Sequence, residues 1–171
     1  MSTTPDDTPA IQPTHAAARP AMLAADYLAL VARACPTYGG PLPKARTGVN
    51  KLTLYKARPG AAVEVWFRRI TPTKFPELRV GVVFASDRAE VNAEAAGKFE
   101  ARFAAELNAL GCEPWPSDTN CDRRFTTPVP VPMPGADVGA FASQAAELGA
   151  RYVELLKRIE GREGAADSQA R

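Results

Sequence analysis

The chain has 171 residues, 46% of them hydrophobic, and a formal net charge of +2 at pH 7. This length is enough for one domain with a substantial core and too short for two ordinary domains. No apolar run approaches the roughly 20 residues that a membrane-spanning helix needs, and the first residues lack the basic and apolar segments of a secretory signal. We therefore expect a cytoplasmic protein without a membrane partner.

Cysteine and histidine are too sparse for several common kinds of site. Cys35, Cys112 and Cys121 form an odd set without a C-x-x-C pair, which indicates neither a disulfide framework nor a zinc site. The only histidine, His15, lies in a polar segment. The glycine motifs of nucleotide-binding loops and the acidic pattern of metal-dependent nucleases are absent as well. We expect no cofactor and no enzymatic activity.

The N-terminal third of the chain predicts a tail followed by one helix. Residues 1–19 combine Pro, Thr, Asp and Ala without periodicity, a composition typical of a disordered tail. From Pro20 onward, apolar residues recur at helical spacing until Cys35 and Pro36. The first helix should therefore begin near Pro20 and end near Cys35.

Three alternating segments then predict an antiparallel meander of strands. In each of them, every second residue is apolar, which is typical of a strand with one buried face. The residues expected on that face are Leu52, Leu54, Val63, Val65, Phe67, Val80, Val82 and Phe84. Lys51, Thr53, Tyr55, Trp66 and Arg79 should lie on the opposite face.

The second half of the chain predicts a helix, a strand and a last helix. Asp87 fits the N-cap of a helix that ends at Gly111. Pro128 and Pro130 interrupt the following strand and place it at a sheet edge. Asp137 can cap the last helix, whose apolar seam comprises Val138, Phe141, Ala145, Leu148, Tyr152, Leu155 and Ile159. Residues 162–171 should fray.

These elements predict an α+β domain over residues 20–161 in the order α-β-β-β-α-β-α. We expect an antiparallel sheet of about four strands, with the helices packed mainly on one face. Such an arrangement leaves the function of the opposite face open.

Charge is distributed unevenly along the chain. Between Lys44 and Arg79, nine basic residues accompany only Glu64 and Glu77, a local net charge of +7 in a chain of +2. Arginine and lysine can meet phosphates while aromatic rings stack on unpaired bases. We therefore predict a non-enzymatic binding module whose basic, aromatic-containing sheet face associates with nucleic acid. The candidate residues are Lys51, Tyr55, Trp66, Arg68, Arg69 and Arg79.

Two alternatives remain open at this point. A helix could cover the same face, so that Trp66 and Tyr55 become core residues and the charges only solvate the edges. Alternatively, the chain could be a protein-interaction or chaperone-like adaptor that uses the exposed sheet face or the last helix. The apolar seam of that helix could also join an identical helix in a homodimer.

The stretch from Leu78 to about Glu160 resembles a bacterial domain of unknown function that often follows a restriction-nuclease-like domain. The pattern comprises the strand 78–84, Asn92, Gly111, Trp115, Arg123 with Arg124, and the seamed last helix. None of these residues is a catalytic signature. The resemblance implies an association with mobile-element or defence functions without indicating a reaction.

Overall fold

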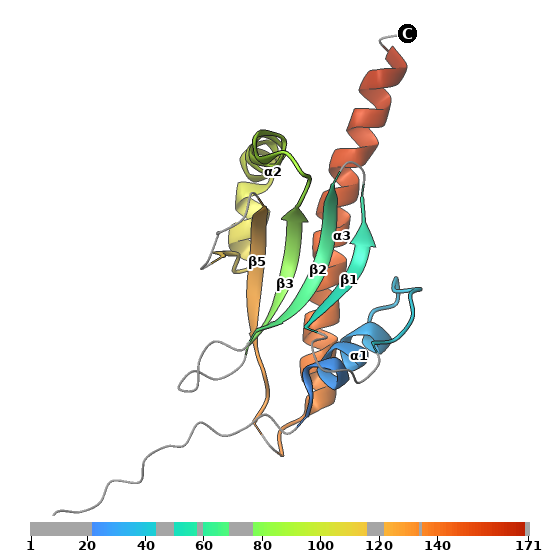
Figure 1. Ribbon diagram of the computed structural model, residues 1–171, viewed down its shortest axis with the longest axis vertical. Coiled ribbons are helices and arrows are strands. Elements are labelled where there is room, and N and C mark those ends of the chain that lie inside the picture. The colour runs from blue at the N-terminus through green and yellow to red at the C-terminus, as the bar shows by residue number, and fades with distance from the viewer. Residues whose placement is uncertain are drawn as a thin grey trace, which may run out of the picture.

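The structure, a computed structural model, describes residues 22–43, 50–57, 60–68, 77–115, 122–133 and 135–169, without the side chains of Arg68, Pro114 and residues 162–169. It confirms an α+β fold with the predicted order of its long elements (Figure 1). The helices are α1 (Ala24–Ala34), α2 (Ala89–Ala109) and α3 (Val138–Gln169). The strands are β1 (Lys51–Lys56), β2 (Ala61–Arg68), β3 (Glu77–Phe84), β4 (Glu113–Pro114) and β5 (Arg123–Pro130).

The sheet is antiparallel throughout, in the order β1-β2-β3-β5-β4. The two-residue strand β4, which the sequence analysis missed, pairs only with Thr126 and Phe125 of β5. Pro128 and Pro130 follow on β5 and have no N–H to donate to a further strand. The predicted edge position of β5 was therefore wrong where β4 pairs outside it, although no described strand pairs outside Pro128 and Pro130.

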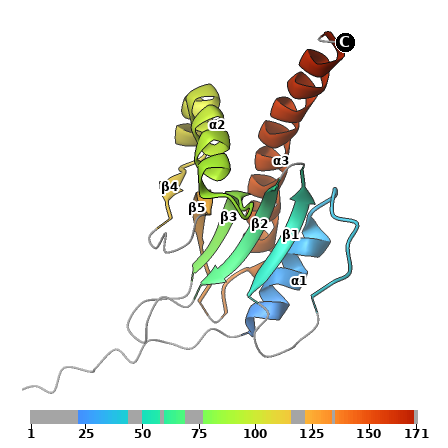
Figure 2. The same cartoon turned by 45° about the horizontal axis from the view of Figure 1, so that its top comes forward.

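All three helices pack against one face of the sheet (Figure 2). Val63, Val65, Val80 and Val82 point to this face and are fully buried, because the period of two in a strand sends alternate residues to the same side. Helix α1 packs beside α3 over β1 and β2, whereas α2 lies over β3 and β5. The core therefore lies between the sheet and a layer of helices.

The start of α2 differs from the prediction. Arg88, and not Asp87, is the N-cap residue, and its side chain makes no capping hydrogen bond. The buried Asn92 anchors the helix instead, since its Oδ1 accepts hydrogen bonds from the backbone N–H and the hydroxyl of Ser86, both at 2.8 Å. A buried amide must find partners, and here those partners fix the approach of the chain from β3.

The last helix begins as predicted. The Asp137 Oδ1 accepts hydrogen bonds from the N–H groups of Gly139 at 2.8 Å and Ala140 at 3.1 Å. The seam of α3 packs into the domain's own core, where Phe141, Ala145, Tyr152 and Leu155 are buried. Most of this seam is therefore not exposed to a second copy of the chain.

Candidate functional site

The face of the sheet opposite the helices, here called the outer face, brings together three of the predicted binding residues. Trp66 lies opposite Lys51 of β1 on one side and Arg79 of β3 on the other. The side chain of Arg68 and the whole of Arg69 lie outside the described residues. The three placed residues are adjacent in space, as alternation along the strands predicts.

Tyr55 does not belong to this group. The pairing of β1 with β2 shifts between Thr53 and Tyr55, so that Tyr55 pairs with the core-facing Val63. Such a bulge adds one residue to a strand and reverses the faces that follow it. The Tyr55 hydroxyl consequently donates a 2.5 Å hydrogen bond to Glu160 of α3, which raises the pKa of Tyr55, helped by partial burial. The predicted placement of Tyr55 was wrong.

Arg79 is buried and surrounded by acceptors. Its Nε lies 2.7 Å from Glu77 Oε1, its second terminal nitrogen 3.1 Å from Glu113 Oε2, and its first 3.2 Å from the buried Thr126 hydroxyl. Only 5% of the residue is exposed. The guanidinium group is thus engaged within the domain and has little surface to offer a phosphate.

Two residues that the site prediction omitted complete the outer face. The Trp115 ring centre lies 5.4 Å from that of Trp66. The Arg124 guanidinium lies 4.9 Å from the Trp115 ring centre and 5.8 Å from that of Trp66, distances typical of cation–π contacts. Trp66 is only 8% exposed as a result. Alternation from Phe125 places Arg124 on this face, but no pattern in the sequence brings Trp115 there.

The charges of the outer face balance one another. Lys51 pairs with Glu64 at 3.0 Å, and Arg124 pairs with Asp122 at 3.0 Å. With Arg79 between Glu77 and Glu113, the described ion pairs here contain three basic and four acidic side chains: Lys51, Arg79 and Arg124 against Glu64, Glu77, Glu113 and Asp122. The local excess of positive charge in the sequence does not become a positive surface in this part of the fold.

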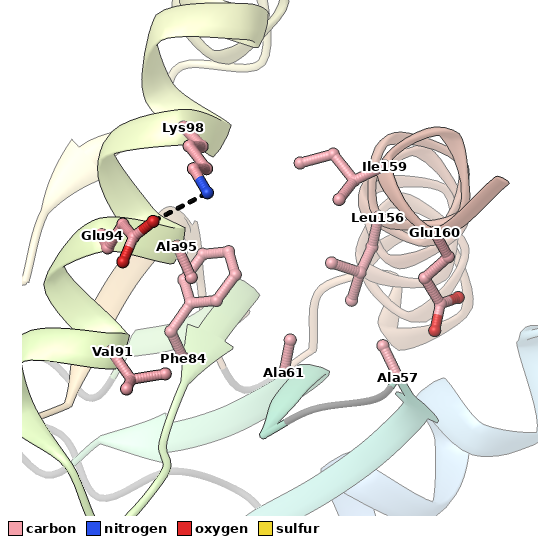
Figure 3. A pocket seen from close by; sticks show the side chains of 10 residues that line it. All are labelled: Ala57, Ala61, Phe84, Val91, Glu94, Ala95, Lys98, Leu156, Ile159 and Glu160. Carbon is pink, nitrogen blue, oxygen red and sulfur yellow. Dashed lines mark ion pairs between the residues drawn. The ribbon is translucent and has the colours of Figure 1, made fainter. Parts of the chain in front are cut away.

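Two cavities with largely apolar linings lie beside α2, one on each side of the helix. The helix contacts the core mainly through a ridge of buried side chains: Asn92, Ala96, Phe99, Phe103 and Leu107. Toward α3 lies a cavity of about 220 Å³, here called the narrow groove (Figure 3). Its apolar lining comprises Ala57, Ala61, Phe84, Val91, Ala95, Leu156 and Ile159, and the ion pair of Glu94 with Lys98 lies at its rim.

On the other side of α2, toward β4 and β5, lies a larger cavity of about 510 Å³, here called the wide groove. Small residues of α2 form one wall, namely Ala93, Ala96, Gly97 and Ala104. Cys112, Trp115 and Phe125 form much of the other wall, together with Arg123 and Arg124. Glu100 and Glu113 also line it. The wide groove therefore combines an apolar lining with a few charged groups.

A buried polar network lies behind the wide groove. The Thr127 hydroxyl donates to the Leu110 carbonyl oxygen at 2.9 Å and shares a 2.9 Å hydrogen bond with the Tyr152 hydroxyl. Burial raises the pKa of Tyr152 and also that of the neighbouring Cys112 thiol. A thiol with a raised pKa is a poor nucleophile at neutral pH, so this network has a structural rather than a reactive character.

Two further features of the described residues concern metals and membranes. Among them, no three His, Cys, Asp or Glu side chains are grouped in a way that could hold a metal ion. None of the helices in the same part of the chain is both long and apolar enough to cross a bilayer.

Comparison with known proteins gives no relative for this chain. No family model, no curated protein and no solved structure matches it. The resemblance of residues 78–160 to a domain of unknown function therefore stays a prediction.

Proposed function

We propose that this chain is a non-enzymatic binding module whose partner is another protein. The observation that carries the proposal is the position of α2, which contacts the sheet along one ridge and leaves an apolar groove on each side. Apolar grooves beside an exposed helix are a common means of holding segments of a partner polypeptide. Burial of apolar side chains there would provide the driving force for association.

Nucleic acid is the alternative partner, and the geometry favours it less. Stacking on a base needs an accessible aromatic face, whereas Trp66 is 8% exposed between Trp115 and Arg124. Phosphate binding needs cations that are not already paired, whereas Arg79, Arg124 and Lys51 each have an acidic partner. Arg68 and Arg69 remain candidates for a nucleic-acid contact that the described residues do not address.

Site-specific photo-crosslinking in the native cell separates the two partner classes. A benzophenone side chain replaces Ala95 in the narrow groove, Gly97 in the wide groove or Lys51 on the outer face. A matched control replaces Ala101, which is exposed on α2 and lines neither groove. We expect discrete protein adducts from one or both groove positions and none from Ala101.

Two results would overturn the proposal. Adducts that nuclease digestion removes, formed from the Lys51 position alone, would assign the partner to nucleic acid. Equal protein adducts at Ala101 and at the groove positions would show that contact with α2 is unspecific. Direct titration with short DNA and RNA at two salt concentrations provides a second measurement, since nucleic-acid binding weakens steeply with salt.

A further inference from the structure

The wide groove contains an arginine, Arg123, whose charge is not neutralised by any of the described residues. Arg123 is half-buried at the start of β5 and makes one hydrogen bond, from a terminal nitrogen to the Asp122 carbonyl oxygen at 3.3 Å. Across the described residues, it has no ion pair. A guanidinium group presents five N–H donors in a planar fork that matches a carboxylate. Within the described part of the chain, most of this donor capacity is unused.

The neighbouring Arg124 also has a hydrogen-bond donor without an acceptor among the described residues. Although one terminal nitrogen of Arg124 pairs with Asp122, its Nε is buried without a hydrogen-bond partner in the described part of the protein. A buried donor without an acceptor destabilises the folded state. Within the described structure, Arg124 therefore leaves a hydrogen-bond donor unsatisfied in the wall of the groove, although this buried atom is not itself accessible to an occupant.

Neither of the two acidic side chains that line the groove, Glu100 and Glu113, forms an ion pair with Arg123 in the described structure. Glu113 is held by Arg79 at 3.1 Å, and Glu100 is exposed on α2 without an ion pair to Arg123. Glu100 would repel a carboxylate placed close to it, whereas Arg123 would attract one. The charges thus distinguish one position along the groove and do not make the whole groove positive.

The dimensions indicate an extended chain segment rather than a compact ligand. The lining residues of α2 run from Ala93 to Asn108, which corresponds to roughly 20 Å at 1.5 Å per residue. About six residues of extended polypeptide span that length. About one helical turn from the Ala93 end of this wall, a side chain at Gly97 would meet nothing within 4 Å, so backbone or side chains of an occupant can approach the helix closely there.

We propose that the wide groove binds a short extended segment of a partner protein that carries apolar side chains and one carboxylate, and that Arg123 binds this carboxylate. The proposal rests on the proposed protein-binding function and adds the chemistry that the partner must present. Apolar contacts with Phe125, Trp115 and the alanines of α2 provide affinity, while the pairing of Arg123 with the carboxylate fixes the position of the segment in the groove.

A displayed library of random 12-residue peptides, selected on the whole chain, provides the probe. We expect the enriched peptides to share an Asp or Glu beside apolar residues. The most enriched peptide is synthesised together with a copy in which the amide replaces the acid, and the acid form should bind about tenfold more tightly, as expected for a charge-assisted hydrogen bond. Amide shifts on binding should concentrate at residues 93–108, 112–115 and 123–125.

Matched variants test separately the pairing of Arg123 with the carboxylate and the binding of the peptide in the groove. Arg123→Gln should remove the difference between the two peptides, Arg123→Lys should keep part of it, and Arg88→Gln should leave it unchanged, because Arg88 is exposed and lines neither groove. Gly97→Leu fills the groove and should abolish binding of both peptides, whereas Ala101→Leu should not. Circular dichroism and thermal melting verify that each variant is folded.

Each outcome bears on a different claim. If Gly97→Leu blocks binding but both peptides bind equally to the wild type, the groove binds polypeptide and the assignment to Arg123 is wrong. If selection enriches no peptide, or if the shifts map to the narrow groove or to β1 and β2 on the outer face, the wide groove is not the site. A concentration-dependent dimer that Arg123→Gln dissociates would instead identify the occupant as a second copy of the chain.

Discussion

Replacing Arg79 with methionine tests the claim that the outer face is a self-contained polar cluster rather than a binding surface. Methionine keeps much of the aliphatic volume and removes the guanidinium group. Three hydrogen-bonded contacts disappear, to Glu77 at 2.7 Å, to Glu113 at 3.1 Å and to Thr126 at 3.2 Å. A cation–π contact with the Trp115 ring, at 5.9 Å, is lost as well. If the cluster is structural, the variant should lose stability, whereas a phosphate-binding arginine could be removed at little structural cost.

The expected loss is about 2–3 kcal/mol of unfolding free energy. Hydrogen bonds to charged groups contribute about 1.5–3 kcal/mol each, but water can replace part of this because the Glu113 side chain is 55% exposed. The hydroxyl of Thr126 is fully buried and regains no water. Arg79→Glu should cost more, since it would place a buried carboxylate beside Glu77 and Glu113.

Urea unfolding followed by tryptophan fluorescence measures the effect, because Trp66 and Trp115 lie in the same cluster. Arg88→Met is the matched control. Arg88 also contacts a glutamate two residues away, Glu90, at 3.2 Å, but both side chains are more than 60% exposed, so its loss should stay within about 0.5 kcal/mol. Equal effects of the two substitutions would refute the reasoning and restore Arg79 as a surface residue.

Three further predictions concern stability. Gly81→Ala should cost at least about 2 kcal/mol in urea unfolding, because its Cβ would lie 2.7 Å from the Thr126 Cα of β5; wild-type stability would contradict the β3–β5 register. Gly97→Ala should raise thermal stability by up to about 1 kcal/mol, since alanine is the better helix former and the site is open, and a lower melting temperature would indicate a hidden contact. Burial raises the pKa of Cys112 and Tyr152, so the folded chain binds these protons more tightly than the unfolded chain; their contribution is complete below about pH 8.5 and lost as the pH rises through the raised values. Unfolding free energies that stay constant up to about pH 11 would exclude this linkage.

Local periodicity was sufficient to predict the long elements, but not the two-residue strand β4. The alternation at Val63, Val65 and Phe67 and the corresponding pattern in β3 identified strands and the buried face, because a period of two leaves no other arrangement. Asp137 was recognised as a cap for the same local reason: its side chain needs only the next turn of the helix.

The errors concern features that depend on neighbours distant in the sequence. The bulge that turns Tyr55 toward α3 arises in the pairing of β1 with β2 and has no signature within β1 itself. Asp87 had the right residue type for a cap, but the hydrogen bonds between Ser86 and Asn92 fix the start of α2 elsewhere.

The sequence by itself therefore determined the class of fold, the order of its long elements and the face of each strand up to the bulge. Tertiary structure alone decided which charges are free. Glu113 and Thr126, 34 and 47 residues away from Arg79, neutralise and bury it, while Arg123 has no such partner among the residues that the structure describes. The reason is physical: backbone periodicity is a local property of a few residues, whereas the pairing and burial of a charge depend on every segment that packs around it.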